Sequence, residues 1–110
     1  MKKNRQKSTQ LFCLFCFLTA GSIAQNYTWM KGSNSYDEAS TYGTLGTPAS
    51  LNNPGERVGA VSWKDATANF WLFGGFGYDS QGNDDYMNDL WKYTLSTNEW
   101  TWINGDTIVY

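Results

Sequence analysis

Two stretches of the sequence decide the fold: FWLFGG at residues 70–75 and NDLWKY at residues 88–93. The first holds four apolar residues in a row, which is typical of a strand covered on both faces. The second alternates, so that Trp91 and Tyr93 lie on one side of a strand and Lys92 on the other. Leu95 continues this alternation. Both patterns predict strands rather than helices.

Two further strand candidates lie outside this pair, RVGAVSW at residues 57–63 and EWTW at residues 99–102. The first is small and apolar, and the second alternates. Turn-forming residues separate the four candidates at residues 64–69, 74–88 and 96–98. We therefore expect a four-stranded antiparallel sheet in which burial falls from the first pair of strands to the second.

The composition agrees with an all-β chain and excludes several chemistries. The 110 residues include 17% aromatic residues and 11 glycines but no histidine. Without histidine there is no imidazole general base, no Ser-His-Asp triad and no imidazole metal ligand. The net charge of -2 also argues against a nucleic-acid partner, which would need a basic face.

Residues 1–24 have the pattern of a secretory signal peptide. A basic start is followed by an apolar run at residues 11–20 and by small residues at Ser22 and Ala24, after which we expect cleavage. The alternatives are an N-terminal anchor and a buried core helix, but the apolar run is too short to span a bilayer. We therefore expect export to the periplasm, cell surface or medium, with no membrane span after signal removal.

Removing the signal changes the chemistry of the chain. Four of the eight basic residues and both cysteines leave with it, while all ten acidic residues stay, so the net charge becomes -6. The remaining 86 residues hold no thiolate nucleophile, no disulfide and no thiolate metal site. We expect no metal and no cofactor, and stability that comes from packing of the tryptophans and tyrosines.

An internal repeat organises the mature chain. The stretch YTWMKG at residues 27–32 returns as WTWING at residues 100–105, shifted by 73 residues. A repeat of this kind indicates an array of similar units. The chain is expected to begin with the last strand of one unit, to pass through a complete unit and to stop as another begins.

The complete unit resembles the kelch repeat of β-propellers. FWLFGG, NDLWKY and TNEW at residues 97–100 match its second, third and fourth strands, and PGERVGAV at residues 54–61 is similar to the start of its first strand, with Ala60 where many repeats carry histidine. The resemblance extends to bacterial exported kelch proteins and to the central domain of galactose oxidase. It implies these boundaries: residues 25–32, last strand of a preceding or closing blade; 33–56, long inter-blade loop; 57–104, kelch blade; 105–110, start of the next repeat.

The motif residues are interpreted first as scaffolding. Two glycines allow a sharp turn after the second strand, and the large aromatic rings fill the space between twisted blades. Arg57 and Asp89 are expected to pair with each other or with backbone groups at strand ends. The structural motif comprises Arg57, Gly59, Gly74, Gly75, Asn88, Asp89, Leu90, Trp91, Tyr93, Trp100 and Trp102.

The long connections predict where binding occurs. In an antiparallel blade, the segment before the first strand and the connection between the second and third strands emerge at the same end, which we call the loop face. Both are long here, at residues 32–55 and 76–87, and long loops are commonly functional. The candidate ligand-binding residues on it are Tyr36, Tyr42, Tyr78, Asp79, Asp84, Asp85 and Tyr86.

Two simpler interpretations of these residues stay open. The acidic residues can solvate a hairpin while the tyrosines cover their own loop. Polar residues at every second position from Asp79 to Asp85 also make a calcium loop conceivable, although the bidentate glutamate and the spacing of an EF-hand are missing.

Two functional classes follow from the resemblance. The preferred one is a non-enzymatic segment of an exported kelch-type propeller that presents its loops to a protein or glycan and packs against further kelch repeats of the same chain. The alternative is part of a copper radical oxidase similar to galactose oxidase. Its site needs histidines, tyrosines and a tyrosine-cysteine cross-link, so it would have to lie in blades absent from this sequence.

Overall fold

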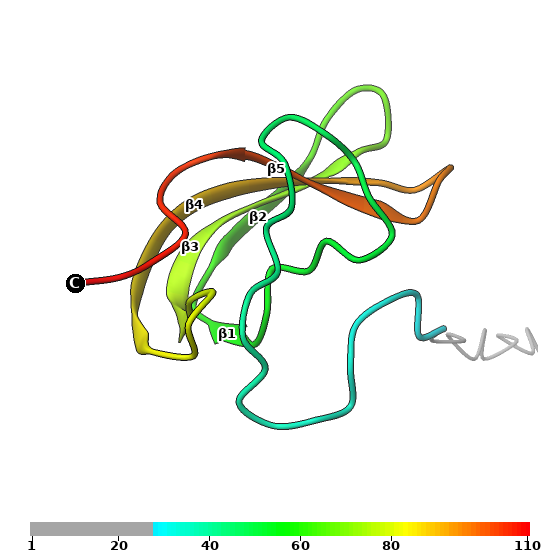
Figure 1. Ribbon diagram of the computed structural model, residues 1–110. Coiled ribbons are helices and arrows are strands. Elements are labelled where there is room, and N and C mark those ends of the chain that lie inside the picture. The colour runs from blue at the N-terminus through cyan, green and yellow to red at the C-terminus, as the bar shows by residue number, and fades with distance from the viewer. Residues whose placement is uncertain (1–27) are drawn as a thin grey trace, which may run out of the picture.

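The computed structural model describes residues 28–110, which form an all-β structure around one antiparallel sheet (Figure 1). The predicted signal peptide, residues 1–24, lies outside this part of the chain. The strands are β1 (Arg57–Val58), β2 (Val61–Lys64), β3 (Phe70–Tyr78), β4 (Asp84–Thr94) and β5 (Glu99–Asn104). β3 pairs with β1, β2 and β4, and β4 pairs with β5. Residues 28–110 contain no helix that could cross a membrane.

The predicted first strand is interrupted. β1 and β2 occupy its two halves, and both pair with β3, with Arg57 opposite Gly77 and Val61 opposite Phe73. The break lies opposite Gly74 and Gly75, where the register between β3 and β4 shifts because two residues of β4, Asn88 and Asp89, face the single residue Gly74 of β3. Gly75 has a φ of 95°, and a Cβ atom there would lie 2.9 Å from the carbonyl oxygen of Val58. Close approach of two backbones therefore requires this glycine.

The Gly74-Gly75 pair does not end its strand, which corrects one expectation. β3 continues through the bulge to Tyr78, and β4 begins at Asp84, so the connection is a tight turn at residues 79–83 rather than a loop over 76–87. Cross-strand contacts stabilise the added ladder. The rings of Phe76 and Tyr86 are in edge contact with centroids 5.4 Å apart.

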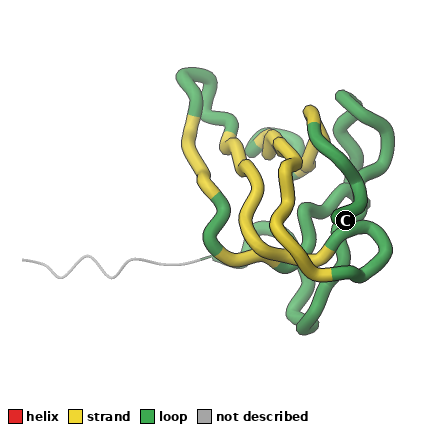
Figure 2. Tube along the Cα trace, turned by 90° about the vertical axis from the view of Figure 1, so that its left-hand side faces the viewer, coloured by secondary structure: helices red, strands yellow, loops and turns green. Residues whose placement is uncertain are grey.

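One face of the sheet carries the core. Trp91 and Tyr93 are buried on it, as the predicted alternation required. Leu95 was predicted on the same side, but β4 ends at Thr94 and Leu95 is 48% exposed. Tyr42 packs on this face, with its ring 5.0 Å from Trp91 and 5.2 Å from Trp102. The segment 38–54 that carries Tyr42 also runs along β5, where the N–H of Ala49 donates to the carbonyl of Trp100. Figure 2 shows the loops gathered on one side of the curved sheet.

The opposite face is left open, and this reverses the predicted gradient of burial. All four residues of β2 are exposed, whereas β4 is the most buried strand. The reason is that segment 38–54 covers the core face beside β4 and β5, while no described segment covers the other face. We call this other face the uncovered face; its exposed apolar residues are Val58, Val61, Trp63, Phe73, Phe76 and Tyr86.

The two ends of the described chain lie beside the sheet without joining it. Residues 28–32, the described part of the predicted strand at 25–32, form no strand, and neither do residues 105–110. Lys31 ties the first of these segments to two loops, because its ammonium donates to the carbonyls of Ser50 at 2.7 Å and Asn98 at 3.2 Å. Their assignment to neighbouring repeats stays a prediction.

Candidate functional site

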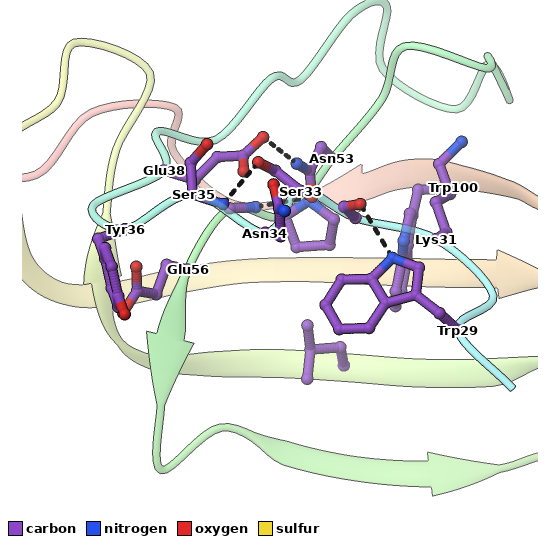
Figure 3. Close-up of a pocket in the computed structure, with 14 residues that line it drawn as sticks. Trp29, Lys31, Ser33, Asn34, Ser35, Tyr36, Glu38, Asn53, Glu56 and Trp100 are labelled. Atoms are coloured by element: carbon purple, nitrogen blue, oxygen red, sulfur yellow. Dashed lines mark hydrogen bonds between the residues drawn. The ribbon is translucent and has the colours of Figure 1, made fainter. Parts of the chain in front are cut away.

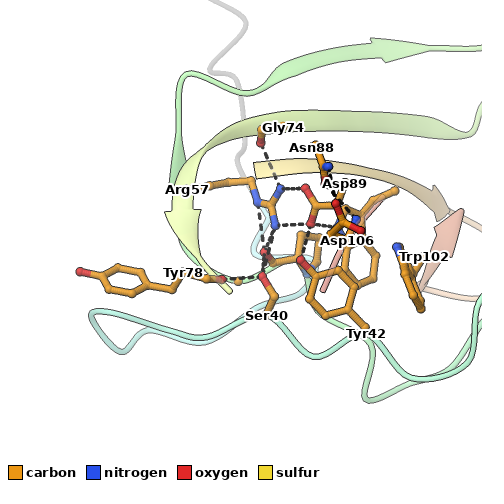
Figure 4. A network of polar contacts seen from close by, with 12 residues as sticks. Ser40, Tyr42, Arg57, Gly74, Tyr78, Asn88, Asp89, Trp102 and Asp106 are labelled. Carbon is orange, nitrogen blue, oxygen red and sulfur yellow. Dashed lines mark hydrogen bonds and ion pairs between the residues drawn. The ribbon is translucent and has the colours of Figure 1, made fainter. Parts of the chain in front are cut away.

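A buried ion pair connects β1 to β4 at the centre of the molecule (Figure 4). The guanidinium of Arg57 donates to both carboxylate oxygens of Asp89, at 2.6 and 2.9 Å. Their side chains are 4% and 0% exposed. The pairing predicted from the sequence is confirmed, and its bidentate geometry is the one in which a guanidinium binds a carboxylate most strongly.

Two aromatic side chains complete the environment of Asp89. The hydroxyl of Tyr42 and the indole N–H of Trp91 both donate to Oδ2, at 2.8 and 2.7 Å. Burial, followed by the hydrogen bond to Asp89, raises the pKa of Tyr42 well above its usual value. Tyr42 therefore remains a neutral donor at physiological pH, and the carboxylate of Asp89 is fully engaged.

The guanidinium also holds the backbone around it. It donates to the carbonyls of Pro54 and Gly74, and to the hydroxyl of Ser40 at 3.3 Å. These contacts join segment 38–54, β1 and Gly74 of β3. We refer to Ser40, Tyr42, Pro54, Arg57, Gly74, Asp89 and Trp91 as the Arg57–Asp89 network. It is buried and internally satisfied, so its role is to build the fold rather than to bind a ligand.

The loop face is formed where segment 33–56 meets the turn at residues 79–83. The hydroxyl of Tyr78 donates to the carboxylate of Asp37 at 2.7 Å, and the N–H of Ser40 donates to the carbonyl of Tyr78 at 3.1 Å. The predicted meeting of the two connections at one end is therefore confirmed. The hydrogen bond to Asp37 raises the pKa of Tyr78 to about 12, because the neutral phenol is the form that donates.

Two of the predicted binding residues are largely exposed, but only Tyr36 lies on the loop face, because Tyr86 belongs to the uncovered face, opposite Phe76. Others are partly engaged in contacts within the chain. Tyr36 is 91% exposed and Tyr86 is 79% exposed. Asp84 is exposed as well, and Asp85 is half-buried with its carboxylate accepting the N–H of Tyr86 at 2.7 Å. Exposed tyrosine rings of this kind offer contact area to a partner at low entropic cost.

Tyr42 and Asp79 are corrected from binding candidates to structural residues. Tyr42 belongs to the Arg57–Asp89 network. Asp79 is fully buried and caps the turn, since its carboxylate accepts the backbone N–H groups of Gln81, Asn83 and Val109 at 2.7, 2.9 and 3.1 Å. Burial opposes its ionisation, but these hydrogen bonds outweigh burial and lower the pKa of Asp79 to about 2.

The turn geometry also accounts for the alternating polar residues from Asp79 to Asp85, for which a calcium loop was considered. The carboxylate of Asp79 is occupied by turn N–H groups and by the Asn83 amide, so its oxygens point to donors of the chain itself. Within residues 28–110, no three acidic side chains lie close enough together to hold a metal ion.

A groove of about 480 Å³ opens beside the loop face, and sequence reasoning did not find it (Figure 3). It lies between residues 29–36, segment 53–56 and the core face of the sheet at Leu72 and Trp100. The carboxylate of Glu38 accepts the amide N–H of Asn53 at 2.9 Å, and that of Glu56 accepts the N–H of Asp37 at 2.6 Å. Only folding brings these stretches together; the long connection at residues 33–56 was the available signal.

A smaller depression of about 320 Å³ lies at the other side of the loop face, lined by Asp85, Tyr86 and the chain end at Tyr110. Asn88, predicted as scaffolding, binds Asp106 through its side chain: Nδ2 donates to the Asp106 carboxylate at 2.7 Å, and Oδ1 accepts the backbone N–H of Asp106 at 2.8 Å. This pair anchors residues 105–110 to β4.

Comparisons of the chain with protein-family models, with curated proteins and with solved structures found no match. The kelch resemblance therefore rests on the sequence motifs alone.

Proposed function

We propose that this chain is a blade, with the edge of a neighbouring repeat, of an exported kelch-type β-propeller. In this proposal it is a non-catalytic binding and scaffold unit that presents its loop face to a protein or glycan. Residues 1–24 direct export, residues 57–104 form the blade, and residues 33–56 form the long loop that leads into it. Residues 25–32 and 105–110 belong to the adjoining repeats.

The observation that carries this proposal is the uncovered face. Val61 is 61% exposed although it lies in the sheet beside Phe73, and Trp63 is 45% exposed although its ring stacks on that of Trp71 with centroids 5.9 Å apart. A sheet with apolar residues on both faces needs cover on both. A neighbouring blade of the same kind would supply it.

The repeated stretch gives a second line of support. Trp29 and Trp102 occupy equivalent positions, and both indole N–H groups donate to a backbone carbonyl shortly after them, that of Gly32 at 3.1 Å and that of Asn104 at 2.8 Å. The glycines that end the two stretches also share a positive φ, 109° at Gly32 and 95° at Gly105. These two shared details support a repeat, although residues 28–32 form no strand whereas residues 100–104 belong to β5.

The binding role is supported by the loop face. It combines the exposed ring of Tyr36 with acidic side chains, and the buried Arg57–Asp89 network holds the segments that carry them. Loops on a rigid scaffold are common binding sites.

A charge on the uncovered face tests the proposal. In the full-length protein we expect Val61→Asp to lower the free energy of unfolding by about 3 kcal/mol or more, because a neighbouring blade would bury the carboxylate. In a protein of residues 25–110 alone, the new carboxylate would be exposed to water, so Val61→Asp should lower the free energy of unfolding by less than about 1 kcal/mol. The matched control Tyr36→Asp, on the loop face, should leave both proteins within about 0.5 kcal/mol. Equal small effects of Val61→Asp in both proteins would refute blade packing.

A further inference from the structure

The groove next to the loop face contains an aromatic ring that is exposed and held in place. Trp29 is 73% exposed, and its indole N–H donates to the carbonyl of Gly32 at 3.1 Å. Its six-membered ring also lies over Gly32, where an added Cβ would be 3.9 Å away. The ring is therefore oriented before any ligand arrives, which reduces the entropy lost on binding.

A second ring lies deeper in the groove. Trp100 is half-buried and is fixed by edge contact with Trp91 and by Tyr93, whose ring centroid is 5.1 Å away. Tyr36 stands at the far end of the groove beside Glu56 (Figure 3). The groove thus offers flat apolar surfaces along its length, and it is large enough for a small-molecule ligand.

Polar groups line the wall between these rings. Glu38 and Asn53 are joined by their hydrogen bond of 2.9 Å, so both side chains are held in one orientation toward the groove. Asn34, Ser33 and Ser35 lie beside them. A carboxylate has four acceptor sites, and an amide both donates and accepts, so the pair can bind neighbouring hydroxyl groups after making its own contact.

The charges in the groove select among ligands. Glu38 and Glu56 are acidic, and the ammonium of Lys31 is already bound to the carbonyls of Ser50 and Asn98. These carbonyls leave the charge of Lys31 in place, so the groove wall carries two carboxylates against one ammonium and a phosphate or carboxylate ligand would meet net repulsion. A neutral ligand that has apolar faces and many hydroxyl groups avoids this cost.

We propose that the groove formed by Trp29, Tyr36, Glu38, Asn53, Glu56 and Trp100 binds a neutral saccharide. Sugar rings stack their C–H faces on Trp29 and Trp100, while Glu38 and Asn53 bind their hydroxyl groups. This inference rests on the proposed binding role and specifies the glycan class of partner and the place where it binds.

The test measures binding of neutral tetrasaccharides to the full-length protein by isothermal titration calorimetry. The probes are cellotetraose, maltotetraose, galactotetraose and mannotetraose, with tetragalacturonate as the anionic counterpart. We expect at least one neutral probe to bind and tetragalacturonate to bind at least tenfold more weakly. Trp29→Ala should weaken the neutral interaction at least tenfold, and Glu38→Ala at least threefold, whereas Trp29→Phe should retain most of it.

The matched control is Tyr110→Ala, which removes an exposed aromatic ring outside the groove and should leave the dissociation constant within twofold. Circular dichroism of Trp29→Ala checks that the fold is kept, as expected for so exposed a side chain. The saccharide proposal is overturned if no neutral probe binds, if tetragalacturonate binds instead, or if Trp29→Ala binds like the parent. None of these results affects the blade proposal, which depends on the response to Val61→Asp.

Discussion

Removing the carboxylate of Asp89 should be among the most destabilising single changes in this chain. Asp89→Ala leaves the guanidinium of Arg57, only 4% exposed, without its counter-ion. It also takes the acceptor away from the Tyr42 hydroxyl and the Trp91 indole N–H, which now donate at 2.8 and 2.7 Å. Leaving one partner of a buried ion pair uncompensated costs about 3–5 kcal/mol. That is a large part of the stability of an ordinary domain, about 5–15 kcal/mol.

Urea unfolding of the full-length protein, followed by tryptophan fluorescence, measures this loss. The matched control is Asp84→Ala, which removes an exposed carboxylate from the same strand and should change the free energy of unfolding by no more than about 0.5 kcal/mol. A loss below about 1 kcal/mol for Asp89→Ala would contradict the role given to the Arg57–Asp89 network.

A double-mutant cycle separates the ion pair from general damage. Arg57→Met and Asp89→Leu together replace both charges by apolar groups, so the pair of changes should cost less than the sum of the single changes by about 1–3 kcal/mol. Strict additivity would mean that the two side chains do not stabilise one another.

Three further predictions concern titration and metal content. Because hydrogen bonds hold the pKa of Asp79 at about 2, against about 3.9 in an unfolded chain, its contribution to stability is complete above pH 4 and lost as the pH falls toward 2. Asp79→Asn should flatten this part of the acid-unfolding curve; an unchanged curve would contradict the capping role. The phenol of Tyr78, with a pKa of about 12 against about 10 unfolded, stabilises the fold below pH 10, and this contribution disappears between pH 10 and 12. Absorbance titration near 295 nm should show a component at pH 12 that Tyr78→Phe removes, and Asp37→Asn should shift this component toward 10. Finally, the full-length protein should carry no stoichiometric copper and form no peroxide with alcohol substrates; copper together with oxidase activity would favour the oxidase alternative.

Sequence patterns predicted the features of this molecule that depend on the spacing of neighbouring residues along one strand or on the direction of the strands. The alternation at Trp91 and Tyr93 identified the buried side of β4, and the pairing of Arg57 with Asp89 was one of the two contacts expected for these residues. Strand polarity was enough to bring the two connections to one loop face, where Tyr78 contacts Asp37. These predictions need only the periodicity and direction of strands.

Other features depended on contacts between distant segments and were predicted wrongly or missed. The Gly74-Gly75 pair reads as a turn, but a bulge opposite the break between β1 and β2 lets β3 continue. Tyr42 was predicted to bind a ligand at the loop face, but in the structure segment 38–54 packs its ring against Trp91. The groove at Trp29 arises only because segments 29–36 and 53–56 meet above the sheet.

The sequence by itself thus determined an all-β chain, the buried side of β4 and the end of the sheet where loops gather. Those properties follow from side-chain period and the alternating direction of antiparallel strands. Only the tertiary structure decided which face of the sheet is covered, which tyrosines remain exposed and where a groove exists. The physical reason is that the burial of a side chain depends on which segment packs against it. Here segment 38–54 covers the core face, and as a loop it has no periodic sequence pattern that would predict this packing.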